Sequence, residues 1–520
     1  MPVLAGLAAI AATLSGFAAP GPATAGPSGP RIHLARVGTH YAVFKPVCAA
    51  SHKFGRASCM AIRRVPATRT TPHARAYDVP AAFARGPKGG YTPNDFAHAY
   101  GYNPARVLAT PQTVAVVDAY DDPNIFNDLN HFDAQYGLTA ETPLSLQKFN
   151  QDGNVAPLPR TDPSGWSEET ALDVETVRAV CNSCTIMLVE ADNPSMINLR
   201  TAAASAAGLG ATEISNSYGS PEPPPGAVSK SAINSFARAY DHRGIVITAA
   251  TGDEGWFSWD FANGGGVSGE APNMPSSFAH VIAVGGTTLK LHGDGTRRSE
   301  TVWNNNGPAN AKGSRHGALG GTGGGCSKWI NAPTWQHHVA GYRNTGCGKK
   351  RLAADIAVDG DPQTGFDVYS SWNCGKRCHP GWATIGGTSL SSPMVAAMFA
   401  LVGGAGGVAY PVASLYAHAK RGHSRFYDVT QGGNSWCDGL KHKTCANRTD
   451  KVTRGASKNP NFLAIGHRNL GTLDCGFKRH THKTTAVKTN LQCKAAKGYD
   501  GPSGVGTPRG LTGFLPPAGP

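Results

Sequence analysis

The chain has 520 residues, of which 16% are charged, and it is rich in Gly (65) and Pro (37). We expect one large domain with additional segments, and this composition is typical of a loop-rich extracellular protein rather than a helical bundle. A net charge of +14 is compatible with an anionic partner. The sequence carries no nucleic-acid-binding motif, so we expect this partner not to be a nucleic acid.

The first 25 residues have the pattern of a signal peptide. The apolar run that begins at Met1 is too short to span a bilayer, and it is followed by the small residues Ala23-Thr-Ala25. The sequence shows no other run that is long and apolar enough for a membrane span, so we expect a secreted, monomeric protein. Residues 26–90, rich in Pro, Ala and Arg, are predicted to form a short pro-segment or N-terminal extension.

The twelve cysteines lie in six close pairs, which favours disulfides in an oxidising compartment. Two of the pairs also have the spacing of zinc ligands, Cys181/Cys184 and Cys374/Cys378. Because the chain carries an export signal, we favour disulfides for all six pairs, without fixing the connectivity. The other pairs are Cys48/Cys59, Cys326/Cys347, Cys437/Cys445 and Cys475/Cys493.

From about Tyr91, strand and helix patterns alternate, and residues 91–520 are predicted to form the main domain. Five runs rich in β-branched residues read as buried strands, at 113–118, 185–190, 211–218, 244–250 and 280–284. Helical patterns fall between them at 168–180, 196–207 and 230–243. This alternation predicts an α/β fold with a parallel sheet covered by helices on both faces.

A glycine turn with a serine precedes an apolar helix near residue 390. The sequence Gly386-Gly-Thr-Ser-Leu-Ser-Ser-Pro393 places Ser389 at the start of this helix, where backbone N–H groups and the helix dipole favour negative charge. Such a place suits a nucleophile whose attack creates an oxyanion. The alternative is a serine that caps the helix, and this motif alone does not decide between them.

Two acidic residues share one face of the helix predicted at 168–180. Glu169 and Asp173 are four residues apart, so their charges repel unless they share a proton. A shared proton leaves one carboxyl able to act as a base at modestly acidic pH. A solvated acidic face is the commoner arrangement, but Leu172, Val174 and Val177 surround this pair with apolar residues.

A third acidic residue follows the buried strand predicted at 244–250. In Ala249-Ala-Thr-Gly-Asp-Glu-Gly255, Asp253 lies at the carboxyl edge of a parallel sheet, where the active sites of such sheets gather. A protonated Asp at this place can donate to an oxyanion. The alternative is an Asp in an ordinary glycine turn.

Taken in this order, the three motifs resemble the sedolisin family of serine-carboxyl peptidases, over roughly Tyr91 to Pro508. The resemblance implies a subtilisin-like fold and an endopeptidase that acts at acidic pH through an acyl-enzyme. It implies that Ser389 is the nucleophile, Glu169 the general base and acid, and Asp173 the residue that orients Glu169.

The resemblance also assigns the remaining parts of a peptidase site. Asp253 is implied to donate to the oxyanion. The segment Ser215-Asn-Ser-Tyr-Gly219 looks like the strand that aligns an extended protein or peptide substrate, through Ser215, Ser217 and Gly219.

One structural calcium ion is implied near the C-terminus. The family's pattern is matched by Tyr427-Asp-Val-Thr-Gln-Gly432 and by Gly498-Tyr-Asp500. The implied ligands are the carboxylates of Asp428 and Asp500 and the backbone oxygens of Val429, Ala496 and Gly498. Oxygen ligands suit a hard cation, and the alternative is a pair of ordinary Asp turns.

The chain departs from the family's pattern in two segments. Residues 26–90 are too short for the large folded prodomain that is typical of the family, which leaves activation open. A basic, Cys-containing insertion at about 437–493 separates the two calcium motifs, with 12 Lys and Arg against 3 Asp between Asp438 and Lys494. We interpret it as a solvated surface or as a site for anionic polymers or cell wall.

Two alternative functions compete with the serine-carboxyl peptidase. The first is a subtilisin-type protease with Asp118, a histidine and Ser389, since Val117-Asp-Ala resembles the strand that carries the catalytic aspartate of subtilisins. His316 is followed by Gly but lies after Asp253, out of order for that family. The second is a non-catalytic secreted binding protein on a protease scaffold, which uses the basic insertion.

Overall fold

The computed structural model describes residues 40–48, 55–68, 75–77, 85–255, 272–305, 320–376, 378–419, 424–434 and 491–517. The predicted signal peptide at 1–25 and most of the basic insertion at 437–493 lie outside these residues. Within the described ranges, no helix is both long enough and apolar enough to cross a membrane.

An eight-stranded sheet forms the centre of the fold, in the order β13-β12-β10-β8-β5-β7-β6, with β16 paired to β12. All its pairings are parallel except that of β12 with β13. The predicted parallel sheet is therefore confirmed. Its strands are β5 (Thr113–Ala119), β6 (Leu146–Asn150), β7 (Thr185–Ala191), β8 (Glu213–Asn216), β10 (Val246–Ala250), β12 (Ile282–Leu291), β13 (Arg297–Val302) and β16 (Ile356–Asp359).

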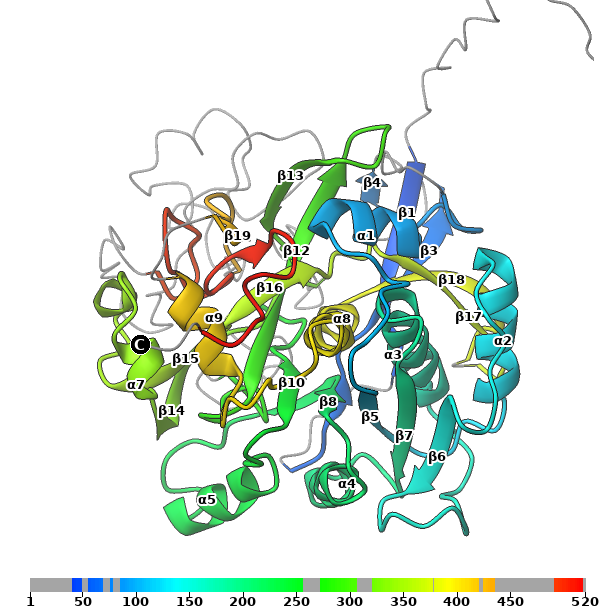
Figure 1. The fold of residues 1–520 in the computed structure, drawn as a ribbon, viewed down its shortest axis with the longest axis horizontal. Helices are drawn as coiled ribbons and strands as arrows, with labels where there is room; N and C mark the ends of the chain where they lie inside the picture. The colour runs from blue at the N-terminus through cyan, green and yellow to red at the C-terminus, as the bar shows by residue number, and fades with distance from the viewer. Residues whose placement is uncertain are drawn as a thin grey trace, which may run out of the picture. The chain divides into compact units, whose positions relative to one another are not determined.

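Helices cover both faces of this sheet. Figure 1 shows α3 (Trp166–Val180) and α8 (Thr388–Ala400) on one face and α4 (Met196–Gly208) on the other. Every residue of α3 and α8 is buried, because both helices lie between the central sheet and other parts of the chain. The arrangement confirms the predicted α/β class.

Two sequence expectations shift in detail. The run predicted as one strand from residue 211 divides into β8 and β9 (Tyr218–Pro221), and β9 leaves the central sheet to pair with β11 (Asn273–Met274) and β2 (Ser58–Cys59). The helix predicted at 230–243 is the shorter α5 (Lys230–Arg238). The backbone N–H of Ala239 closes a tight last turn onto Phe236, and the chain then turns at Gly244 towards β10.

A second, antiparallel sheet joins the N-terminal segment to the chain that leads into α8. Its order is β17-β18-β3-β1-β4, and Figure 1 shows the blue strands β1 and β3 beside the yellow-green β17 and β18. The segment predicted as an N-terminal extension thus supplies three of the five strands. The strands are β17 (Phe366–Ser370), β18 (Gly381–Gly386), β3 (Ile62–Ala67), β1 (His40–Pro46) and β4 (Arg75–Tyr77).

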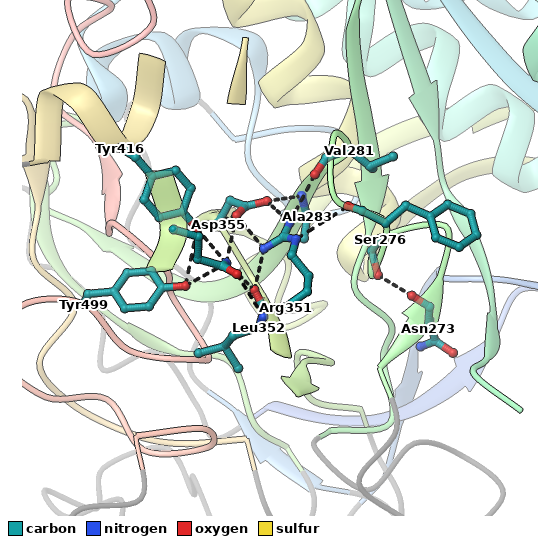
Figure 2. A network of polar contacts seen from close by, with 11 residues as sticks. Asn273, Ser276, Val281, Ala283, Arg351, Leu352, Asp355, Tyr416 and Tyr499 are labelled. Atoms are coloured by element: carbon teal, nitrogen blue, oxygen red, sulfur yellow. Dashed lines mark hydrogen bonds and ion pairs between the residues drawn. The ribbon is translucent and has the colours of Figure 1, made fainter. Parts of the chain in front are cut away.

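The C-terminal part packs against the far end of the central sheet through a buried polar network (Figure 2). Arg351 pairs with Asp355, and the Tyr416 hydroxyl donates to the same carboxylate. Tyr499 enters the network through Gln336, whose amide donates to its hydroxyl at 3.0 Å. The network fixes the segment around Tyr499.

The smaller elements complete the chain. The two-stranded ladders are β14 (Gly325–Asn331) with β15 (Lys350–Ala353) and β19 (Phe426–Tyr427) with β20 (Thr507–Pro508). The remaining helices are α1 (Pro93–Tyr100), α2 (Ile125–Tyr136), α7 (Thr334–His337), the 3-10 turn η1 (Tyr342–Thr345) and α9 (Val412–Ala419).

Four of the six predicted cysteine pairs are disulfides, which excludes zinc for the two pairs with ligand-like spacing. They are Cys48–Cys59, Cys181–Cys184, Cys326–Cys347 and Cys374–Cys378. The pair Cys437/Cys445 lies outside the described residues, as does Cys475, the predicted partner of Cys493.

Candidate active site

Ser389 is the second residue of α8, directly after the tight turn that ends β18. Gly387 caps the helix with φ 113°, in the left-handed region that favours glycine. A Cβ atom on Gly387 would lie 2.1 Å from the carbonyl oxygen of Met60 and 2.7 Å from Oδ2 of Asp253. The turn therefore brings these two oxygens and Ser389 to one place, and Ser389 itself is fully buried.

The backbone of Ser389 is held by the segment between β8 and β9. Pro393 has no N–H, so the Ser389 carbonyl lacks the donor that a regular helix would supply four residues later. The Ser217 hydroxyl donates to that carbonyl at 3.3 Å instead. In return, the Ser389 hydroxyl donates to the Ser217 carbonyl at 3.1 Å.

Helix α3 carries the two predicted carboxyls against Ser389. Glu169 and Asp173 are one turn apart and fully buried, and Asp118 on β5 is equally buried. One carboxylate oxygen of each of these three residues lies within 4.8 Å of the other two. None of their oxygens has a hydrogen-bond partner among the described residues. Three acidic groups without a cationic partner therefore share one buried site.

Burial is the main cause that raises the pKa of each member of this cluster. For Glu169 the neighbouring Asp173 and Asp118 raise the pKa further, and for Asp173 the neighbour that does so is Asp118. The pKa of Asp118 rises to about 8, mainly because it is buried. The cluster therefore holds protons at pH values where exposed carboxyls are ionised.

The Ser389 hydroxyl lies beside Glu169, close enough to lower the pKa of that carboxyl. Its hydrogen bond nevertheless goes to Ser217, and both oxygens of Glu169 are without a hydrogen bond. Ser389 and Glu169 are therefore neighbours that are not hydrogen-bonded to one another in this structure. Catalytic hydrogen bonds often form only when substrate is in place.

Asp253 completes the site from the end of β10. Its Oδ1 accepts hydrogen bonds from the backbone N–H of Thr388, at 2.8 Å, and from the Thr388 hydroxyl, at 3.0 Å. Its Oδ2 is buried without a partner. Burial and the neighbouring Glu254 raise the pKa of Asp253 well above its usual value, so this carboxyl holds a proton at pH values where an exposed carboxyl is ionised.

The predicted substrate strand has a mixed arrangement. Ser217 presents its carbonyl to Ser389, and Gly219 on β9 pairs with Ser58 on β2. The Ser215 hydroxyl instead contacts the Ser392 hydroxyl on α8 at 3.0 Å and is fully buried. The side chain of Ser215 thus supports the strand from inside.

The residues proposed as calcium ligands also come together. The backbone N–H of Gly498 donates to Asp428 at 2.9 Å, and that of Ala496 donates to the fully buried Asp500 at 2.9 Å. Val429 is buried beside them. Burial raises the pKa of Asp500 to about 8, and Asp428 raises it as well. Asp428 is half-buried, and two neighbouring carboxylates supply the oxygen ligands that a hard cation prefers.

Sequence reasoning missed two parts of the site. Asp118 was considered only for a histidine-based triad, whereas the structure places it in the cluster with Glu169 and Asp173. Its position at the end of a buried strand was a usable signal. Met60 belongs to the segment predicted as a short pro-segment or N-terminal extension. Its carbonyl accepts from the Ser389 N–H, a contact that depends on tertiary pairing. In the part of the chain described, no histidine joins Ser389 and Asp118.

Comparisons with known proteins agree with this arrangement. The model of the subtilase family matches residues 163–407. Kumamolisin from Bacillus sp. (strain MN-32) is 30% identical over 358 residues, which is 66% of this chain and 57% of kumamolisin. Sedolisin from Pseudomonas sp. (strain 101) is 27% identical over 379 residues, 71% of this chain and 60% of sedolisin. The chain spans less than two thirds of the length of these relatives.

Among solved structures, Pseudomonas sedolisin, described as a serine-carboxyl proteinase in complex with two molecules of pseudo-iodotyrostatin, matches with a TM-score of 0.57. Its identity to this chain is 24%, over 82% of this chain and 96% of that one, so this likeness shows the fold. The sequence relatives therefore show that the chain is similar to kumamolisin and sedolisin, and the solved structure shows that it shares their fold.

Proposed function

We propose that the chain is a secreted serine-carboxyl endopeptidase that hydrolyses peptide bonds through an acyl-enzyme on Ser389. One observation carries the proposal: the Ser389 hydroxyl lies beside the buried pair of Glu169 and Asp173. The backbone N–H of Ser389 and Oδ2 of Asp253 both lie near one backbone carbonyl oxygen, that of Met60. The similarity to kumamolisin and sedolisin and the proteinase description of the solved relative support it.

We assign each residue a step that fits this geometry. Ser389 Oγ attacks the substrate carbonyl carbon and passes its proton to Glu169, which then protonates the leaving amine. Asp173, one helical turn away, is a positioning residue that shares the proton of Glu169. The N–H of Ser389 and the protonated Asp253 stabilise the oxyanion. Water then attacks the acyl carbon and gives a proton to Glu169, which returns a proton to Ser389 Oγ as the acyl group leaves as a carboxylic acid.

Acidic pH suits this chemistry because two of these carboxyls must hold a proton. Ionised Asp253 has no proton to donate, and a doubly ionised Glu169–Asp173 pair repels itself. Burial keeps the pKa of all three groups raised. We therefore expect activity to fall as pH rises and these protons are lost.

The direct test compares two single variants, Glu169→Gln and Ser389→Ala, with wild type. Their peptidase activity is measured on unfolded protein substrate at acidic pH. We expect each variant to lose at least about a thousandfold in kcat/KM, since each removes a proton-transfer partner or the nucleophile. Glu175→Gln is the matched control: Glu175 is on the same helix, equally buried and with a raised pKa, but it accepts from Tyr369 on β17. Wild-type activity in Glu169→Gln would refute the mechanism.

Secretion is part of the proposal. Four disulfides within the described residues suit an oxidising compartment, where such bonds persist. Protein or peptide substrates would bind in extended form along β9, as β2 does in this structure.

We also propose one structural calcium ion at Asp428 and Asp500. Bound there, the ion would neutralise two neighbouring carboxylates and join the segment after β19 to the segment around Tyr499. The backbone oxygens of Val429, Ala496 and Gly498 would be further ligands. Calcium at a hundredfold excess over Kd should raise the free energy of unfolding of wild-type protein by about 3 kcal/mol relative to protein in chelator, which a higher Tm reports. Asp500→Asn should abolish this difference, and an equal calcium effect in that variant would contradict the site.

A further inference from the structure

Two arginine side chains meet on the hydroxyl of one buried tyrosine, Tyr120. Nη2 of Arg56 donates to this hydroxyl at 3.2 Å, and Nη2 of Arg160 donates to it at 3.3 Å. The Arg160 guanidinium also lies over the tyrosine ring, 5.0 Å from its centroid. Tyr120 is 2% exposed, whereas Arg56 is half-buried and Arg160 is exposed. Two positive charges thus share one neutral oxygen that solvent can approach from the side of Arg160.

The backbone of Tyr120 has a conformation that is uncommon for a residue with a side chain. Among the residues that the structure describes, Tyr120 is the one non-glycine residue with a positive φ, at 72°. It directly follows β5, and its N–H donates to the Ala191 carbonyl at 2.7 Å. The left-handed region is unfavourable for a residue with a Cβ atom, and strain of this kind is concentrated at functional sites. The strain therefore marks the place where the two arginines meet.

Backbone hydrogen bonds hold the segments that carry the two arginines. The N–H of Asp121 donates to the Arg160 carbonyl at 3.0 Å, which joins the end of β5 to the loop between β6 and α3. The N–H of Ala57 donates to the Pro194 carbonyl at 2.8 Å, which fixes the backbone next to Arg56. The guanidinium groups therefore project from backbone that is already ordered, so a ligand would pay little to organise them.

No carboxylate in the described part of the chain forms an ion pair with Arg56 or Arg160. The acidic residues next to them in sequence have other partners. Asp121 pairs with Lys148, and Asp162 accepts from backbone N–H groups at the start of α3. The two guanidinium groups therefore repel one another, and the described residues supply no counter-ion.

The hydrogen-bonding groups at this place are nearly all donors. A guanidinium has N–H donors and no acceptor, and the Tyr120 hydroxyl already accepts from both arginines. No residue within the described ranges accepts the proton of that hydroxyl. A carboxylate has two oxygens, whereas a tetrahedral oxyanion has enough of them to accept from both guanidinium groups and from the hydroxyl at once. The donor set therefore fits a tetrahedral oxyanion best.

We propose that Arg56, Arg160 and Tyr120 form a binding site for a tetrahedral oxyanion, inorganic phosphate or sulfate. The bound ion accepts hydrogen bonds from both guanidinium groups and neutralises the repulsion between them. It thereby joins the segment before β2 to the loop between β6 and α3. None of the three residues has a step in the proposed peptidase reaction, so the site and that reaction are tested separately.

The test titrates sodium sulfate into the purified full-length chain carrying Ser389→Ala, which prevents self-digestion, and measures the heat of binding at constant ionic strength. We expect one saturable site, for which sodium phosphate competes. Arg56→Gln and Arg160→Gln should each weaken the Kd at least about tenfold, because each removes a charge-assisted hydrogen bond. Tyr120→Phe keeps the ring and should weaken the Kd by less. Sodium acetate should bind at least about tenfold more weakly than sulfate.

Arg200→Gln is the matched control, because Arg200 also lies over an aromatic ring, that of Phe236, at 4.6 Å, and the change removes the same charge. It should leave the Kd for sulfate unchanged. Arg160→Lys keeps the charge without the planar fork, so its affinity should lie between those of Arg160→Gln and the unchanged site. Sulfate effects without saturation, or equal affinity after Arg56→Gln, Arg160→Gln and Arg200→Gln, would overturn the site, since they indicate a general salt effect. Acetate that binds as tightly as sulfate would overturn the assignment to a tetrahedral ion.

Discussion

Two buried acidic sites of this molecule differ in how their carboxylates are satisfied. Asp355 receives Arg351, the Tyr416 hydroxyl and the backbone N–H of Ala283, the last at 2.7 Å (Figure 2). Glu169 and Asp173, buried to the same extent, have no hydrogen-bond partner within the described residues. The first arrangement stabilises a junction, whereas the second leaves carboxyls free to exchange protons.

Whether a buried carboxyl has hydrogen-bond partners indicates whether it stabilises the fold or takes part in proton transfer. Burial of an unpaired charge costs several kcal/mol, so a cluster without partners persists only with protons bound. The cluster of Glu169, Asp173 and Asp118 thus holds protons beside Ser389, the proposed nucleophile. The Arg351–Asp355 pair has both charges satisfied and lies away from Ser389, so we expect mutations there to change stability and not chemistry.

We expect the largest effect at the Arg351–Asp355 ion pair, on the free energy of unfolding. Arg351→Met leaves Asp355 charged and buried without its cation, which should cost about 3–5 kcal/mol of unfolding free energy. The measurement is chemical denaturation of the Ser389→Ala form, which prevents self-digestion. The double variant Arg351→Met with Asp355→Leu should recover only part of the loss, because the N–H of Ala283 then lacks its acceptor. A loss below about 1 kcal/mol would contradict the comparison.

Much of this contrast was predictable from sequence, and part was not. The parallel sheet and the α3 and α8 helices follow from β-branched runs and apolar periodicity, and the spacing of Glu169 and Asp173 was visible on one helix face. Asp118 was considered only within the alternative histidine-based triad, because its distance to Glu169 depends on packing between β5 and α3. The site of Met60 depends on pairing across about 160 residues, which local pattern does not encode.

Among the carboxyls beside Ser389, the change Asp253→Ala should remove the proposed oxyanion donor and leave the fold intact. We expect kcat to fall by about 10²–10³ with little change in KM, since the contact matters in the transition state. Asp253→Asn keeps a donor that does not ionise, so it should retain more activity than Ala and lose less of it as pH rises. An equal loss in both variants, with a wild-type pH profile for Asn, would argue against a protonated Asp253.

Asp118 offers a test by pH. Its pKa rises from 3.8 to about 8 in the folded chain, so folded protein binds the proton more tightly than unfolded protein. That contribution to stability is fully present below about pH 4 and is lost as pH rises to about 8. Asp118→Asn cannot lose a proton, so its stability should exceed that of wild type by a margin that grows by about 1 kcal/mol per pH unit across this window. A constant margin, measured by denaturation of Ser389→Ala forms, would mean that Asp118 is ionised throughout.

The smallest effect concerns how the nucleophile's backbone is satisfied. Ser217→Ala removes the hydroxyl that donates to the Ser389 carbonyl, and Pro393 supplies no N–H in its place. We expect a loss of about 1 kcal/mol. Pro393→Ala restores a helical donor, so the same Ser217→Ala change should cost less in that background. A double-mutant cycle measures this difference directly, and equal costs in both backgrounds would show that the Ser217 hydroxyl does not replace the missing helical donor.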